Sequence, residues 1–120
     1  MVELPIRMLT ETVGAAPQMG PEDVAQVAAA GFKSIVNNRP NFEYDAEQPT
    51  HASIEAAARE AGLAYRFLPV GPSYQSAEEA QQLAALLEEL PKPVLLFCRS
   101  GTRSTRLFLM ASQIDQGTFP

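Results

Sequence analysis

The residues best suited to chemistry form one short stretch, which contains the chain's only cysteine. A thiol, two guanidinium groups, three hydroxyls and a glycine follow one another there in the order Cys98-Arg99-Ser100-Gly101-Thr102-Arg103-Ser104. A thiolate beside cations is a nucleophile, whereas a cysteine packed among apolar side chains is inert. The two arginines favour the reactive interpretation, because a buried inert thiol needs no cations.

The elements on either side of this stretch would place the thiol between a strand end and a helix start. Residues 94–97 are all apolar, which predicts a central strand covered on both faces. The pattern over residues 104–112 predicts a helix directly after the stretch. Because helix N-termini and guanidinium groups stabilise anions, we expect Cys98 to be a thiolate at neutral pH. Gly101 permits the sharp turn between the two elements.

The rest of the chain alternates between strand and helix patterns. Ser76 and Glu79 form the clearest helix-start signal, a capping box, and Gly31 and Gly62 are placed to end two earlier helices. The alternation predicts an α/β fold: a single domain over residues 1–120 with a mostly parallel central sheet flanked by helices. In order, the expected elements are a strand over 6–9, a helix from 20, a strand over 32–36, a helix from 50, a strand over 63–70 and a helix over 77–90.

Composition and charge exclude several classes of function. The formal net charge of −5 disfavours a contact with the phosphate backbone of nucleic acid. Residues 1–10 carry no signal-peptide or membrane-spanning pattern, so we expect a cytoplasmic protein with no membrane partner. One histidine and one cysteine do not make a typical zinc site, and no glycine pattern for nucleotides occurs, so no metal or cofactor is expected. The sequence does not indicate an oligomeric state.

The stretch from Cys98 to Ser104 resembles the active-site loop of rhodanese sulfurtransferases and, in outline, the phosphate loop of cysteine-dependent phosphatases. Most of the chain resembles the beta-lactamase-hydrolase-like, phosphatase-like domain family, through residues 31–40 (GFKSIVNNRP), 61–65 (AGLAY) and 93–98 (PVLLFC). The resemblance implies a fold like that of tyrosine phosphatases. Some members are joined to sulfur dioxygenases of the metallo-β-lactamase type, which implies a role in sulfide or persulfide handling and a sulfur dioxygenase as partner.

Two features favour sulfur transfer over phosphate hydrolysis. Phosphatases of this type carry the arginine six positions after the cysteine, whereas Arg103 comes after five and Ser104 takes the sixth, a spacing that matches the tighter rhodanese loop. In addition, residues 70–75 contain no acid that could protonate a leaving alkoxide. Other candidates for that acid lie on the loop after Pro40: Glu43, Asp45 and Glu47.

We therefore expect a sulfurtransferase in which Cys98 takes sulfur from a small anionic donor, holds it as a persulfide and passes it to a second nucleophile. Arg103 would be the main cation on the anion. Arg39, at the carboxyl end of another strand, would face the same cleft or pair with the acidic loop. Further expected binding residues are Arg99, Ser100, Gly101, Thr102 and Ser104. The alternatives are a cysteine-dependent phosphatase acting on phosphoesters and a non-catalytic module that binds anions or docks a partner.

Overall fold

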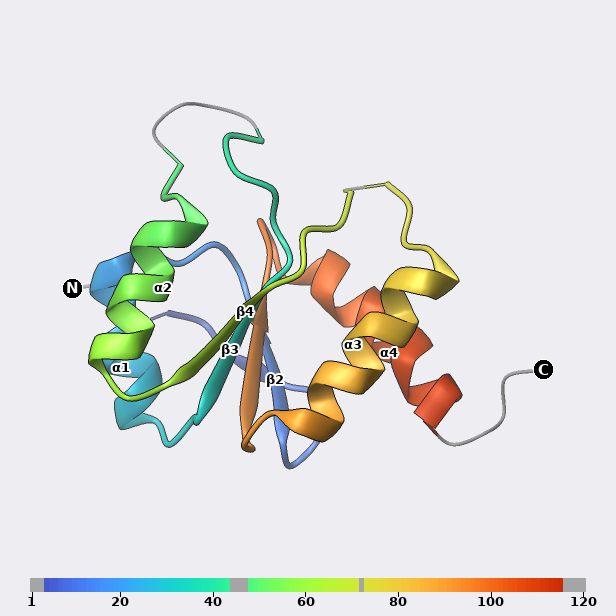
Figure 1. Ribbon diagram of the computed structural model, residues 1–120, viewed down its shortest axis with the longest axis horizontal. Helices are drawn as coiled ribbons and strands as arrows, with labels where there is room; N and C mark the ends of the chain where they lie inside the picture. Colours follow the sequence, from blue (N-terminus) through green and yellow to red (C-terminus); the bar gives the residue numbers. More distant parts are fainter. Residues whose placement is uncertain (1–3, 44–47, 72, 116–120) are drawn as a thin grey trace.

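The computed structural model describes residues 4–43, 48–71 and 73–115, which form one five-stranded sheet with helices on both faces (Figure 1). The strand order is β1-β2-β5-β3-β4, and β1 alone runs antiparallel to its neighbour. The strands are β1 (Arg7–Met8), β2 (Val13–Ala16), β3 (Ser34–Asn37), β4 (Ala64–Phe67) and β5 (Val94–Phe97). The helices are η1 (Pro21–Asp23), α1 (Val24–Ala29), α2 (His51–Glu60), α3 (Ala77–Glu89) and α4 (Thr102–Asp115). The predicted α/β class is confirmed.

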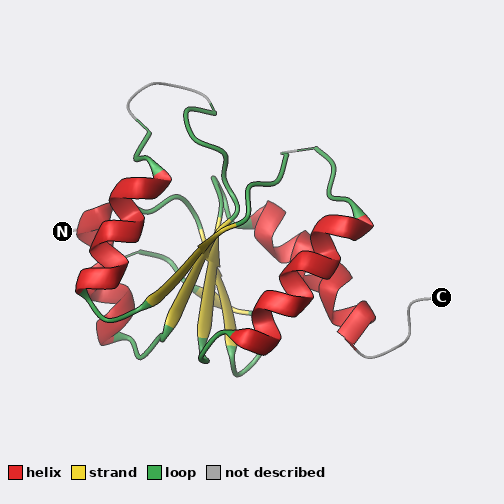
Figure 2. Cartoon of the chain, in the orientation of Figure 1, coloured by secondary structure: helices red, strands yellow, loops and turns green. Residues whose placement is uncertain are grey.

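Strand β5 is the centre of the molecule, as its apolar sequence predicts. It pairs with β2 on one side and β3 on the other. Its side chains alternate between two cores: Val94 and Leu96 belong to the cluster that includes α3 and α4, whereas Leu95 and Phe97 belong to the cluster that includes α1 and α2. All four are fully buried. Figure 2 shows the sheet lying between these two helical layers.

The predicted helix boundaries at α2 and α3 are confirmed by their capping contacts. The Thr50 hydroxyl accepts the backbone N–H of Ser53 at 3.2 Å. Ser76 and Glu79 form the reciprocal capping box, with the Glu79 N–H donating to the Ser76 hydroxyl at 3.0 Å and the Ser76 N–H to the Glu79 carboxylate at 2.8 Å. Gly62 follows α2 with φ of +82°, a conformation that favours glycine.

Strand β2 is absent from the sequence prediction. Its residues, Val-Gly-Ala-Ala, have weak strand propensity, but all four are buried and pair in register with β5. A Cβ on Gly14 would lie 3.1 Å from both Met8 and Phe32, so close packing against these side chains favours glycine there. Tertiary pairing therefore outweighs local propensity in this inner strand of the sheet. The predicted first strand shortens to the two residues of β1, and α4 begins at Thr102, two residues earlier than expected.

No helix in the described part of the chain is long and apolar enough to cross a membrane.

Candidate functional site

The thiol of Cys98 lies in the turn between β5 and α4, where the sequence places it. Cys98 is 1% exposed, and its Sγ accepts the backbone N–H of Gly101 at 3.0 Å. Gly101 has φ of +91°, and a Cβ there would lie 3.5 Å from the Ala16 backbone. The loop therefore curls around the sulfur, with an amide N–H directed at it, in a backbone conformation that favours glycine.

Strand β2 and the residues that follow it, up to Gln18, form backbone hydrogen bonds with this loop. The Cys98 N–H donates to the Ala16 carbonyl at 3.3 Å, and the Gln18 N–H donates to the Arg99 carbonyl at 3.1 Å. At the start of α4 the Thr105 hydroxyl donates to the Gly101 carbonyl at 2.8 Å. These contacts fix the backbone on both sides of the thiol.

The three hydroxyls of the loop have different roles. Ser100 and Thr102 are both exposed, so their hydroxyls are accessible at the surface. The Ser100 hydroxyl donates to Thr102 Oγ1 at 3.2 Å. Ser104 is fully buried and donates to Asn38 Oδ1 at 2.8 Å, while Asn38 Nδ2 donates to the Leu68 carbonyl at 3.0 Å. The Ser104 hydroxyl, which the sequence predicts to bind the ligand, instead connects α4 to the ends of β3 and β4 through Asn38.

The side chain of Arg103 points into the protein. Its NH1 donates to the Val70 carbonyl and lies within 3.0 Å of Glu43 Oε2, and its NH2 donates to Glu43 Oε1 at 3.0 Å. Its Nε is buried and has no hydrogen-bond partner among the described residues. The guanidinium thus keeps one unpaired donor in a place where unpaired donors are costly.

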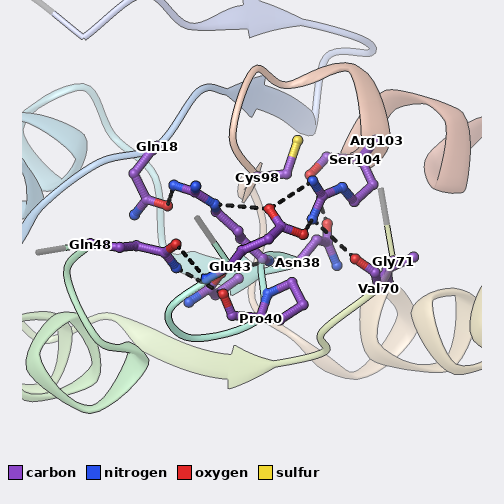
Figure 3. A network of polar contacts seen from close by, with 12 residues as sticks. Gln18, Asn38, Pro40, Glu43, Gln48, Val70, Gly71, Cys98, Arg103 and Ser104 are labelled. Carbon is purple, nitrogen blue, oxygen red and sulfur yellow. Dashed lines mark hydrogen bonds and ion pairs between the residues drawn. The ribbon is translucent and has the colours of Figure 1, made fainter. Parts of the chain in front are cut away.

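Glu43 holds two guanidinium groups together. Its Oε1 also accepts Arg39 Nε at 3.1 Å, and the side chains of Arg39, Glu43 and Arg103 are at most 10% exposed. Burial by itself raises the pKa of Glu43, but hydrogen bonds and charge from Arg103 and Arg39 outweigh it and hold that pKa below 4.5. Figure 3 shows the Glu43 carboxylate facing Arg103, with the Cys98 sulfur pointing away from it.

Neighbouring amides complete the network around Arg39 and Glu43. Arg39 NH1 donates to Gln18 Oε1 at 2.9 Å. Gln48 accepts the Glu43 N–H at 3.0 Å and donates to the Pro40 carbonyl at 2.8 Å. Arg39 therefore pairs with the acidic loop and, through Glu43, joins Arg103.

Three further predicted residues are Arg99, Asp45 and Glu47. Arg99 is exposed at the rim of the loop, while Asp45 and Glu47 fall outside the described residues. Gln18, Asn38 and Gln48 were not predicted, because an isolated amide carries no signal in a sequence. In the described part of the chain, no three His, Cys, Asp or Glu side chains gather into a metal-binding group.

Comparisons with known proteins agree with this architecture. The family model of the beta-lactamase hydrolase-like protein, phosphatase-like domain, matches residues 5–115. A beta-lactamase hydrolase-like protein from Xylella fastidiosa is 33% identical over 107 residues, which are 89% of this chain but 25% of that protein. The chain thus spans about a quarter of the length of this curated relative.

Two solved structures share the fold. A candidate phosphatase from Neisseria meningitidis is 30% identical, with a TM-score of 0.78, and the match covers 90% of this chain and 74% of that one. A candidate phosphatase from Shewanella putrefaciens is 19% identical, with a TM-score of 0.77, and the match covers 96% of this chain and 71% of that one. The expected cysteine-phosphatase-like fold is confirmed.

The expectation of a sulfurtransferase is wrong. The neighbours that share the fold are described as phosphatases, and neither they nor the relative named above carries a sulfur-transfer description. The error lies in the spacing argument, which took position along the chain as a measure of how tightly the loop encloses its ligand. The Arg103 side chain instead leaves the loop for Val70 and Glu43. The solved structures that share the fold likewise give no support to the expected sulfur donor or to the expected sulfur dioxygenase partner.

Proposed function

The chain belongs to the family of the phosphatase-like domain of beta-lactamase hydrolase-like proteins, and on that premise we propose that it is a cysteine-dependent phosphatase acting on phosphoesters. One observation carries the proposal: the only thiol lies at the carboxyl end of the central strand, against the Gly101 N–H and just before α4. An amide N–H and a helix start favour negative charge at this point, both on sulfur and on a phosphoryl group.

The proposed reaction has two steps. The Cys98 thiolate attacks phosphorus, forming an S–P bond while the P–O bond to the leaving group breaks and its electron pair stays on the departing oxygen. Water then attacks phosphorus, the S–P bond breaks, and inorganic phosphate leaves with the thiolate restored. The protein gains and loses no electrons over the cycle.

We assign the positive charge for this reaction to Arg103, which Glu43 joins to Arg39. The buried Nε of Arg103 is a donor without a protein partner among the described residues, which suits it to a phosphoryl oxygen. Glu43 fixes the orientation of the same guanidinium through both carboxylate oxygens. We assign Arg103 to anion binding, Glu43 to positioning, and the exposed Ser100 and Thr102 to the rim of the site.

Leaving-group chemistry narrows the choice of test substrate. Glu43 is a poor general acid, because its lowered pKa keeps it ionised at neutral pH and the sulfur points away from it. A phenoxide leaves without prior protonation more readily than an alkoxide. Aryl phosphates are therefore the substrates on which the proposed activity is tested.

The test is hydrolysis of phenyl phosphate at neutral pH by the purified chain, followed as release of inorganic phosphate. We expect turnover of about 1 per second or more, its loss in both Cys98→Ser and Cys98→Ala, and a phosphoryl adduct on Cys98 by mass spectrometry after an acid quench. Hydrolysis that survives in both variants contradicts the mechanism. Phosphate binding without turnover by the unmodified chain would support the non-catalytic alternative.

A further inference from the structure

A cavity of about 380 Å³ adjoins the Cys98 loop on the side of β1 and β2. Its lining includes Ser100, Gly101 and Thr102 of the loop, together with an apolar floor that contains Ala16 and Pro17. A larger cavity of about 650 Å³ involves Thr10, Thr12 and Lys92, at the opposite end of the sheet from Cys98. Of these two cavities, the smaller one therefore shares residues with the loop that carries the thiol.

Two arginines from separate elements line the smaller cavity, Arg7 from the edge strand β1 and Arg106 from α4. Both side chains are exposed, and neither makes a hydrogen bond or ion pair with another described residue. Among the described residues of the lining, none is acidic. Two guanidinium groups that have no acidic partner in the described part of the chain therefore line the same cavity.

This arrangement gathers positive charge at one cavity of an acidic chain. The net charge is −5, and the ion pairs in the described part of the chain neutralise four of its nine basic residues: Arg39, Arg59, Arg66 and Arg103. Arg7 and Arg106 are not among them. Guanidinium groups bind phosphate through paired N–H donors, and exposed hydroxyls such as Ser100 and Thr102 add further donors.

We propose that the Arg7–Arg106 cavity is a subsite for a second phosphate group, so that the substrate is a small bisphosphorylated molecule with one phosphate at Cys98 and the other between these arginines. The inference rests on the proposed function and names its substrate class. A concave pocket beside the loop that carries the thiol favours a small molecule over an extended chain, which would need a groove.

The inference is tested by binding to the Cys98→Ser protein, which does not turn the ligand over. The probes are phenyl phosphate and benzene-1,3-diyl bisphosphate, which share the aryl group and differ by one phosphate, and calorimetry measures both affinities. We expect the bisphosphate to bind about tenfold more tightly, and this advantage to fall to about twofold or less when Arg7→Gln and Arg106→Gln are added.

Lys33→Gln is the matched control, because it removes the same charge from an exposed residue next to the amino end of β3, at the opposite end of the sheet. It should preserve the advantage of the bisphosphate. In the chain with Cys98 intact, the two arginine substitutions should leave hydrolysis of phenyl phosphate unchanged and raise KM for the bisphosphate about tenfold. The single variants, with circular dichroism as a folding check, replace the double variant if it fails to fold.

The outcomes separate this inference from the proposed function. Equal affinity for the two esters, or an advantage that persists without Arg7 and Arg106, overturns the subsite. Arginine-dependent binding of the bisphosphate with no hydrolysis by the unmodified chain supports the subsite and overturns the phosphatase. Failure of both esters to bind overturns both.

Discussion

The Glu43 carboxylate holds the Arg103 guanidinium in place, and a substitution of Glu43 tests whether this contact matters. Glu43→Gln keeps the size of the side chain but removes the charge that two buried guanidinium groups share. We expect the variant to lose about 3 kcal/mol of stability in urea denaturation and at least about tenfold in kcat/KM for phenyl phosphate. Glu55→Gln is the control: its exposed pair with Arg59 is worth at most about 1 kcal/mol, and it lies on α2.

The same carboxylate predicts a pH dependence of stability. Because the pKa of Glu43 is lower in the folded protein than its usual 4.5, its ionised form stabilises the fold above that pH. The contribution is lost as the pH falls through the lowered value. The stability difference between the unmodified protein and Glu43→Gln should therefore be constant from pH 7 to about 5 and shrink below 4.5. A difference that is the same at pH 3 and pH 7 contradicts this account.

At this scale the sequence indicated candidate residues but not the directions of their side chains. Cys98, Arg103 and Arg39 stand out because thiols and cations at strand ends are chemically conspicuous. The direction of the Arg103 side chain depends on Val70 and Glu43, which are 33 and 60 residues away in the chain. The number of residues between a cysteine and an arginine says nothing about such long-range contacts. The prediction of sulfur transfer relied on that number and was wrong.

At the scale of elements, the β5–α4 turn needs Gly101 both for its positive φ and for its close approach to Ala16, and substitutions can separate these two requirements. Gly101 and Gly62 both have positive φ, so alanine at either position should cost about 1–2 kcal/mol of stability. Only at Gly101 does a Cβ meet other atoms within 4 Å, and only its N–H contacts the Cys98 sulfur. We therefore expect Gly101→Ala to lower kcat and Gly62→Ala to leave it unchanged. Equal kcat in the two variants would show that the shape of the turn is not needed for turnover.

Elements with a strong local signal were predicted well, and those held by distant partners were not. Capping residues at Thr50 and Ser76 mark the starts of α2 and α3, and four apolar residues mark β5. Strand β2 lacks such a signal, because glycine and alanine form a strand there only when β5 lies beside them. The strand matters for the site, since its Ala16 carbonyl accepts the Cys98 N–H.

At the scale of the whole molecule, β5 links the two cores through neighbouring side chains. Leu95 packs in one core and Leu96 in the other, and both are fully buried. We expect Leu95→Ala and Leu96→Ala each to cost about 3 kcal/mol, with unfolding in urea remaining a single transition by both circular dichroism and tyrosine fluorescence. Two separated transitions in either variant would mean that the helical layers unfold independently.

Because Cys98 is the chain's only cysteine and contacts the Gly101 amide, its chemical reactivity reports on the motion of this loop. With no other sulfhydryl in the sequence, a chromogenic disulfide reagent can modify this position and no other. Since the turn encloses the sulfur, we expect a reagent bulkier than a phosphoryl group to react only when the backbone around the thiol opens. Its reaction rate therefore measures the opening frequency of the loop, without a label having to be engineered into the chain.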